Sequence, residues 1–149
     1  MVDLEPKSGT YALLLSSARN AVIRVGRLGE LRLRRGFYVY VGSALGPGGV
    51  RARVAHHLHP AERPHWHIDY LKVHASLEAV WFCYGRQTRE HRWANRFAAI
   101  PGASAPLAGF GSSDCDCESH LFYFRKSPAD ERFTPAGAAR TRLLRFVRG

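Results

Sequence analysis

The sequence contains no apolar run long enough to cross a membrane, few lysines and few cysteines. Its first residues, MVDLEPKSG, carry acids and a proline where a secretory signal would need a basic start and an apolar run. We therefore expect a cytoplasmic protein that does not use a membrane. The odd set Cys83, Cys115 and Cys117 disfavours a disulfide framework in a reducing compartment, which leaves free thiols or metal ligands.

Acidic residues are also scarce. The chain has 12 Asp and Glu residues against 22 Lys and Arg residues, which gives a formal net charge of +10. Such an excess favours a polyanionic partner through counterion release and long-range steering. Nucleic acid is the first candidate, DNA with RNA not excluded, although a merely soluble basic surface would have the same composition.

Repeats and low-complexity linkers are absent, and 149 residues suffice for one compact core but not for two ordinary domains. We predict a single domain over residues 1–149. Segments rich in β-branched and aromatic residues predict strands, and helical spacing of apolar residues predicts helices. The predicted strands are 10–16, 21–25, 37–41, 79–84 and 120–125, and the predicted helices are 50–58, 66–75, 89–99 and 136–148.

This mixture indicates an α+β fold, in which a small central antiparallel sheet is flanked by helices. The turn-prone residues 17–20 predict that the first two strands form a hairpin. Pairing of strands would also bring Tyr11 and Tyr40 into one neighbourhood. The residues expected to face the core are Val50, Val54 and Leu58 in the first helix, Trp93 and Phe97 in the third, and Ala139, Leu143 and Val147 in the last.

Four short motifs occur in a suggestive order. Gly9-Thr10-Tyr11 and Tyr40-Val41-Gly42 each lie on an expected strand, and residues 53–58, RVAHHL, follow on a helix. Arg53 and His57 are one turn apart in that helix, so they share a face. Glu90 opens the helical segment REHRWANRFA. This ordered set resembles the GIY-YIG nucleases.

The resemblance covers residues 9–125 as a core, followed by a basic, helical extension at 126–149. HWHIDYL at 65–71 and GFGSSDCDCESHLFYF at 109–124 are similar to a functionally unassigned branch of that superfamily. Members of the branch are sometimes joined to base-excision-repair glycosylase domains, which suggests DNA repair. The resemblance implies a divalent-metal-dependent endonuclease or related phosphodiesterase that hydrolyses DNA.

The resemblance also implies roles for five residues. Tyr11 would orient or deprotonate the attacking water, with His57 as a proton acceptor and Tyr40 lining the same pocket. Arg53 offers a planar fork of donors to a phosphate. Glu90 would hold one Mg²⁺ or Mn²⁺ through a single carboxylate. Each residue also has a structural interpretation, because tyrosines pack in strands, arginines solvate helices and glutamates favour helix N-termini.

Other residues compete for the contact with nucleic acid. The segment 46–49, GPGG, lengthens the link to the helix, so Arg51 competes with Arg53 for the phosphate. His65 and His67 lie in a histidine-rich stretch and, together with Asp69, could contact phosphate or a metal. A run of histidines can also be an ordinary surface.

Two thiols and an imidazole fall within six positions, at Cys115, Cys117 and His120. This soft set suits Zn²⁺ if a fourth ligand such as His65 or His67 approaches. The alternative is thiols packed beside the sheet.

Three functions therefore remain. A nuclease predicts that Tyr11, Tyr40, Arg53 and Glu90 converge in one cleft. A non-catalytic nucleic-acid-binding module predicts a basic surface without that convergence, and a zinc-stabilised interaction protein predicts metal at the thiols.

Overall fold

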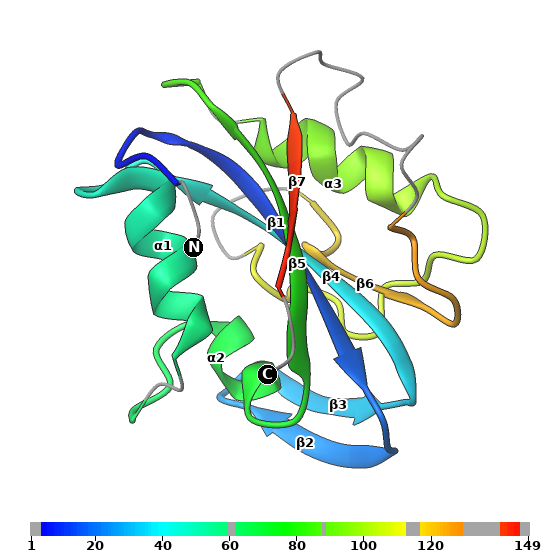
Figure 1. Cartoon of the computed structure of the whole chain (residues 1–149). Coiled ribbons are helices and arrows are strands. Elements are labelled where there is room, and N and C mark those ends of the chain that lie inside the picture. Colours follow the sequence, from blue (N-terminus) through cyan, green and yellow to red (C-terminus); the bar gives the residue numbers. More distant parts are fainter. Residues whose placement is uncertain (1–3, 60–61, 88, 113–116, 130–140, 147–149) are drawn as a thin grey trace.

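A computed structural model describes residues 4–59, 62–87, 89–112, 117–129 and 141–146. Its framework is a five-stranded antiparallel sheet of order β6-β4-β1-β5-β7, beside a two-stranded hairpin of β2 and β3 (Figure 1). The α+β fold is therefore confirmed. The strands are β1 (Gly9–Ser17), β2 (Ala21–Val25), β3 (Gly29–Leu33), β4 (Gly36–Ala44), β5 (Ser76–Tyr84), β6 (Leu121–Phe124) and β7 (Arg142–Arg145). The helices are α1 (Gly49–Leu58), α2 (His67–Lys72) and α3 (Glu90–Ala98).

Both faces of the five-stranded sheet are covered, which explains why the apolar run in β1 does not alternate with polar residues. Leu13 and Leu15 pack on one face, against α1, α2 and the β2–β3 hairpin. Leu14 packs on the opposite face, together with Trp93 and Phe97 of α3. Figure 1 shows α1 and α2 on one side of the sheet and α3 on the other. We call these the α1 face and the α3 face.

The predicted hairpin between residues 10–16 and 21–25 is wrong. Strand β1 is central and pairs with β4 on one side and β5 on the other, so neither of its edges is open to β2. Strand β2 instead pairs with β3, with Ile23 opposite Leu31. Because alternate residues of this hairpin are apolar, it buries Ile23, Val25, Leu31 and Leu33 against the α1 face.

The helices agree with the sequence prediction except in detail. Trp93 and Phe97 of α3 are fully buried, as predicted. In α1 the buried side chains are Val50, Val54 and His57, whereas Leu58 is 44% exposed. The predicted apolar face was thus wrong at its last position, because His57 turns inward in place of Leu58. None of the helices in the described ranges is long and apolar enough to span a membrane.

The C-terminal segment also differs from its prediction. A helix over 136–148 is wrong for the described residues 141–146, because Arg142–Arg145 form β7, paired antiparallel with β5. The rest of that predicted helix, including Ala139 and Val147, lies outside the described residues. Leu143 packs with the core of the α3 face and Leu144 with that of the α1 face. Successive side chains of a strand point to opposite faces of the sheet, so these two leucines reach both cores. On a helix, neighbouring residues could not pack on opposite sides of a sheet in this way.

Candidate active site on the α1 face

The two motif tyrosines lie on neighbouring central strands and point to the same face. Tyr11 of β1 stands opposite Gly42 of β4, and Leu13 stands opposite Tyr40, so the tyrosines are diagonal neighbours. Both pack in the core of the α1 face. The ring of His57 lies beside both, with centroids 5.4 Å from Tyr11 and 6.3 Å from Tyr40. The prediction that strand pairing brings Tyr11 and Tyr40 together is confirmed.

Gly42 makes room for the ring of Tyr11. A Cβ atom at Gly42 would lie 2.6 Å from the Tyr11 hydroxyl, closer than any side chain permits. The glycine of the second motif is therefore a packing requirement set by the tyrosine of the first, which stands directly opposite it in the sheet.

The Tyr11 hydroxyl and His57 Nε2 form a buried hydrogen bond of 2.9 Å. Burial raises the pKa of Tyr11 well above its usual value, and the neighbouring Tyr40 and Glu90 raise it further, whereas Arg53 lowers it. Burial also lowers the pKa of His57 to about 3, with Lys72 and His56 acting in the same direction. Both partners are therefore neutral at ordinary pH. His57 Nδ1 is buried and has no hydrogen-bond partner among the described residues.

Arg53 precedes His57 by one turn of α1 and contributes charge to the site. Its guanidinium lies 4.4 Å from the ring centre of Trp66, in a cation–π contact, and acts on the hydroxyl of Tyr11. Arg51 is exposed and makes no such contact with the tyrosines. Of the two arginines, Arg53 is the one that lies close enough to act on Tyr11.

Glu90 begins α3 and lies near enough to Tyr11 and Tyr40 for its charge to act on both hydroxyls. One carboxylate oxygen accepts a hydrogen bond from Ser43 Oγ at 3.1 Å, and the other lies 3.1 Å from His120 Nδ1. Burial alone would raise the pKa of Glu90, but His120 and Ser43 outweigh it and hold the pKa below its usual value. The carboxylate is thus ionised at neutral pH, and its charge raises the pKa of Tyr11 and of Tyr40.

The loop 109–112 forms a wall beside Tyr40. Gly111 has a φ of +69°, and a Cβ there would lie 2.8 Å from the Tyr40 ring. Its backbone N–H donates to His67 Nδ1 at 2.8 Å, so His67 holds this loop in place with a nitrogen that is no longer free for phosphate. Burial lowers the pKa of His67. His65 is exposed, and its ring meets that of Trp66 edge-on, with the centroids 5.4 Å apart.

Asp69 was considered from the sequence only as a contact for a metal or phosphate, whereas in the structure it supports the segment before α2. Its buried carboxylate accepts the backbone N–H groups of His65 and Trp66, each at 2.9 Å. It also contacts Lys72 at 3.4 Å and His56 at 3.3 Å. An acid in the first turn of a short helix, three residues after Trp66, is the signal that could have identified this role.

Besides the single carboxylate of Glu90, two groups of side chains among the described residues could hold a metal. The first is His91, Cys117 and His120, and the second is His56, His57 and Asp69. Of the predicted zinc ligands, Cys117 and His120 come together, whereas Cys115 lies outside the described residues. Neither His65 nor His67 belongs to the group. His91, from α3, takes the place predicted for them.

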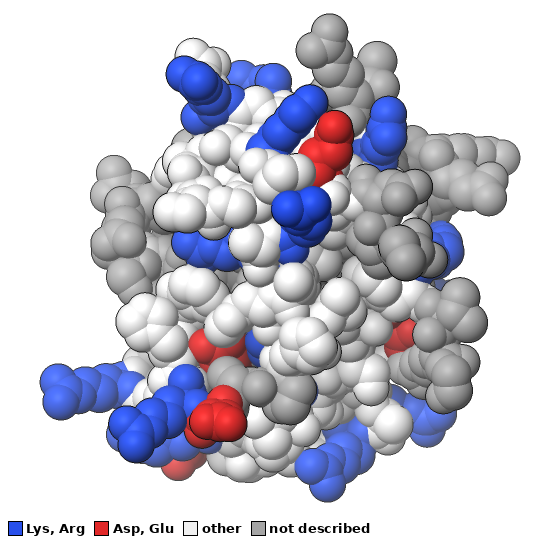
Figure 2. Space-filling model, turned by 60° about the vertical axis from the view of Figure 1, so that its left-hand side comes forward, with Lys and Arg blue, Asp and Glu red and all other residues white. Residues whose placement is uncertain are grey.

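The charged residues are distributed rather than concentrated. Figure 2 shows Lys and Arg side chains over the upper and lower parts of one face, with fewer Asp and Glu side chains among them. On the face drawn in Figure 2, the basic side chains therefore do not gather in a single patch.

Together, the fold and the site define a small α+β domain in which a tyrosine of the central sheet and a histidine of α1 form a buried pair near an arginine and a carboxylate. The chain belongs to the family described as domain of unknown function DUF123, whose family model matches residues 10–140. The matched segment contains all five residues of the candidate site. Neither the curated proteins nor the solved structures contain a match to this chain.

Proposed function

We propose that this protein is a cytoplasmic, divalent-metal-dependent endonuclease or related phosphodiesterase that acts on DNA. The observation that supports the proposal is the buried hydrogen bond between Tyr11 and His57, with Arg53 and Glu90 near enough for their charges to shift the pKa of Tyr11 in opposite directions. The same residues carry the resemblance to the GIY-YIG nucleases. Titratable groups whose pKa is shifted by burial, as in the Tyr11–His57 pair, collect at functional sites.

Phosphodiester hydrolysis needs an oriented water and neutralisation of the charge that develops on the phosphoryl oxygens. Tyr11 is suited to orienting a water through its hydroxyl. Because Tyr11 resists losing a proton and His57 resists gaining one, the pair acts as a neutral hydrogen-bond relay, not as a tyrosinate base. Arg53 supplies the positive charge, and its planar fork suits two phosphoryl oxygens at once.

Glu90 is suited to holding one Mg²⁺ or Mn²⁺. Its side chain is ionised and 22% exposed, and Ser43 and His120 fix the direction of its oxygens. Such a single carboxylate leaves water and phosphate oxygens to complete an octahedral shell. The cation, when bound, supplies a Lewis acid that activates water and neutralises phosphate.

DNA is the proposed partner because of the net charge of +10, and RNA has the same backbone chemistry. Arg51 and Arg53 lie on one helix beside the site, so they are the first candidates for contacts with phosphates. His65, which is exposed, is a further candidate, and His67 is another through its second ring nitrogen, since Nδ1 accepts from Gly111.

The test is cleavage of plasmid, single-stranded, branched and abasic DNA with Mg²⁺ or Mn²⁺. Glu90→Gln removes the metal-holding charge without changing size, so it should abolish cleavage while DNA affinity stays equal or rises slightly. Glu30→Gln, at an exposed position of the β2–β3 hairpin, is the matched control and should cut like the wild type. Metal-dependent cleavage that survives in Glu90→Gln would overturn the assignment.

A non-catalytic nucleic-acid-binding module is the second candidate. The observation that favours it is the burial of Tyr11, which is only 1% exposed and so cannot touch a substrate unless its surroundings open. A wild-type protein that binds DNA with a steep dependence on salt, yet cuts no substrate of the panel, would establish this alternative.

A further inference from the structure

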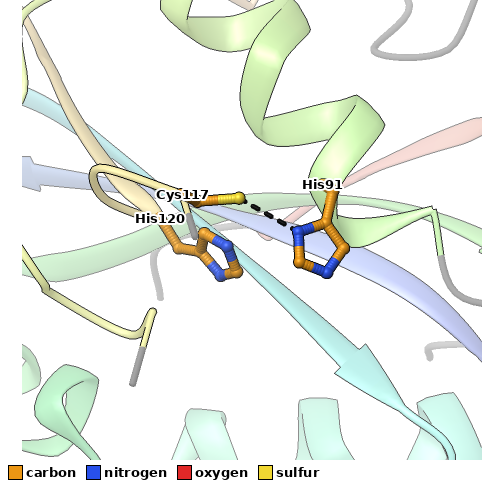
Figure 3. Close-up of side chains that lie close together, drawn as sticks. All are labelled: His91, Cys117 and His120. Atoms are coloured by element: carbon orange, nitrogen blue, oxygen red, sulfur yellow. Dashed lines mark hydrogen bonds between the residues drawn. The ribbon is translucent and has the colours of Figure 1, made fainter. Parts of the chain in front are cut away.

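We propose that His91, Cys117 and His120 form a second metal site, which binds Zn²⁺ or a similar soft cation and is distinct from the site proposed at Glu90. His91 comes from the first turn of α3, and the other two residues come from the segment that leads into β6. One ligand atom from each lies within 4.8 Å of the others. Figure 3 shows the three side chains directed toward one another.

The geometry is close to what zinc requires. With Zn–S bonds of about 2.3 Å and Zn–N bonds of about 2.0 Å, the ligand atoms of a tetrahedral zinc lie about 3.5 Å apart. His91 Nδ1 and Cys117 Sγ are 3.0 Å apart, and the whole group falls within 4.8 Å. Small side-chain rotations therefore suffice to admit the ion.

The chemistry of the ligands selects the metal. A thiolate with two imidazoles favours Zn²⁺ over Mg²⁺ or Mn²⁺, which prefer oxygen ligands. The other histidine group is a poorer candidate, because the Asp69 carboxylate already accepts two backbone N–H groups and contacts the Lys72 ammonium. A cation at that position would lie beside a fixed positive charge.

An ion can reach the proposed site from solvent. His91 is exposed, and Cys117 lines a cavity of about 300 Å³ between α3 and residues 103–105. Three protein ligands also leave room for a fourth, such as water, around a tetrahedral ion.

Metal at this position would tie the start of α3 to the segment before β6. His91 directly follows Glu90, and His120 contacts the Glu90 carboxylate. The backbone N–H of His120 donates to the Phe110 carbonyl at 2.8 Å, and its own carbonyl accepts from Val41 at 3.0 Å. The ion would thus brace the loop beside Tyr40 and, through His120, the Glu90 carboxylate.

The test measures metal rather than cleavage, so its result is independent of the proposed nuclease activity. The full chain is stripped with chelator, titrated with Zn²⁺ against a chromophoric chelator, and analysed for bound zinc by mass spectrometry. We expect one zinc per chain. Replacement of zinc with Co²⁺ should give a thiolate-to-cobalt charge-transfer band, which oxygen ligands cannot produce.

His91→Ala and Cys117→Ser are the test variants, and His59→Ala and Cys83→Ala are the controls from outside the group. His91 and His59 are both exposed, so circular dichroism should find both alanine variants folded. We expect the test variants to weaken zinc binding by more than the roughly 10–100-fold typical of an outer-shell partner. The charge-transfer band should vanish in Cys117→Ser and persist in Cys83→Ala.

The competing interpretation is that Cys117 is a thiol hydrogen-bonded to His91 and binds no metal. Alkylation of Cys117 distinguishes the two interpretations. Zinc should protect Cys117 from alkylation, mapped by peptide mass spectrometry, in the wild type but not in His91→Ala. Absence of stoichiometric zinc binding, or equal affinity in the wild type and His91→Ala, would overturn the proposal whether or not the protein cleaves DNA.

Discussion

The tyrosine site on the α1 face and the His91–Cys117–His120 group differ in what holds them together. Tyr11 and Tyr40 are placed by the register of two central strands, and both are buried. The second group joins a helix start to a connecting segment, and His91 is exposed. The positions of the side chains at the first site are therefore set by the folded core. At the second site, a bound ion would hold the three side chains in place. Substitutions should affect folding at the first site and metal content at the second.

Arg53 provides the largest expected effect, because it belongs to the tyrosine site without being part of its buried core. Arg53→Ala should lower the rate of DNA cleavage by about 10²–10³, equivalent to roughly 2.7–4 kcal/mol if the guanidinium acts like an oxyanion-hole donor. Arg51→Ala, from an exposed position on the same helix, is the control for general charge loss. Equal rates in the two variants under saturating DNA would remove Arg53 from the chemistry.

Gly42→Ala tests the claim that geometry at the tyrosine site is inseparable from folding. Because the new Cβ would lie 2.6 Å from the Tyr11 hydroxyl, the free energy of unfolding should fall by about 1–3 kcal/mol. Gly46→Ala is the matched control, since a Cβ there meets nothing within 4 Å. Urea denaturation measures both. A Gly42→Ala protein as stable as Gly46→Ala would mean that Tyr11 can move without cost.

Local sequence patterns could predict which side of a strand or helix is buried, because that depends on alternation or helical spacing. Trp93 and Phe97, four residues apart, identified the buried side of α3. The order of the tyrosine motifs indicated that strand pairing would bring Tyr11 and Tyr40 together. The first prediction depends on periodicity along a short segment, which the sequence contains in full. The second also needed the two strands to be neighbours in the sheet, which the order of the motifs suggested.

The predictions that failed required knowledge of distant partners. Residues 21–25 do not pair with β1, because β4 and β5, which come later in the chain, occupy both of its edges. Arg142–Arg145 form a strand because β5 offers an edge, although their local pattern suits a helix. His91 was missed as a metal ligand because it lies 26 residues from Cys117 along the chain.

The pH dependence of stability provides the smallest expected effect and tests how completely the tyrosine site is buried. The unfolded chain protonates His57 near pH 6.5, its ordinary value, whereas in the folded protein burial lowers the pKa to about 3. Between these values the unfolded chain binds more protons, so acidification favours unfolding. Lys72, His56 and Arg53 oppose protonation of His57, and only Asp69 favours it.

From pH 6.5 to pH 5, above the range in which carboxylates titrate, the free energy of unfolding should fall by about 1 kcal/mol per pH unit through His57. His57→Gln removes the titrating group, and although it also alters absolute stability through Tyr11, the slope with pH should flatten. His59→Gln, at an exposed position, should keep the wild-type slope. Denaturation midpoints across this range measure the difference. Parallel slopes for the wild type and His57→Gln would mean that burial does not lower the pKa of His57, so that its ring takes up a proton over the same pH range in the folded protein as in the unfolded chain.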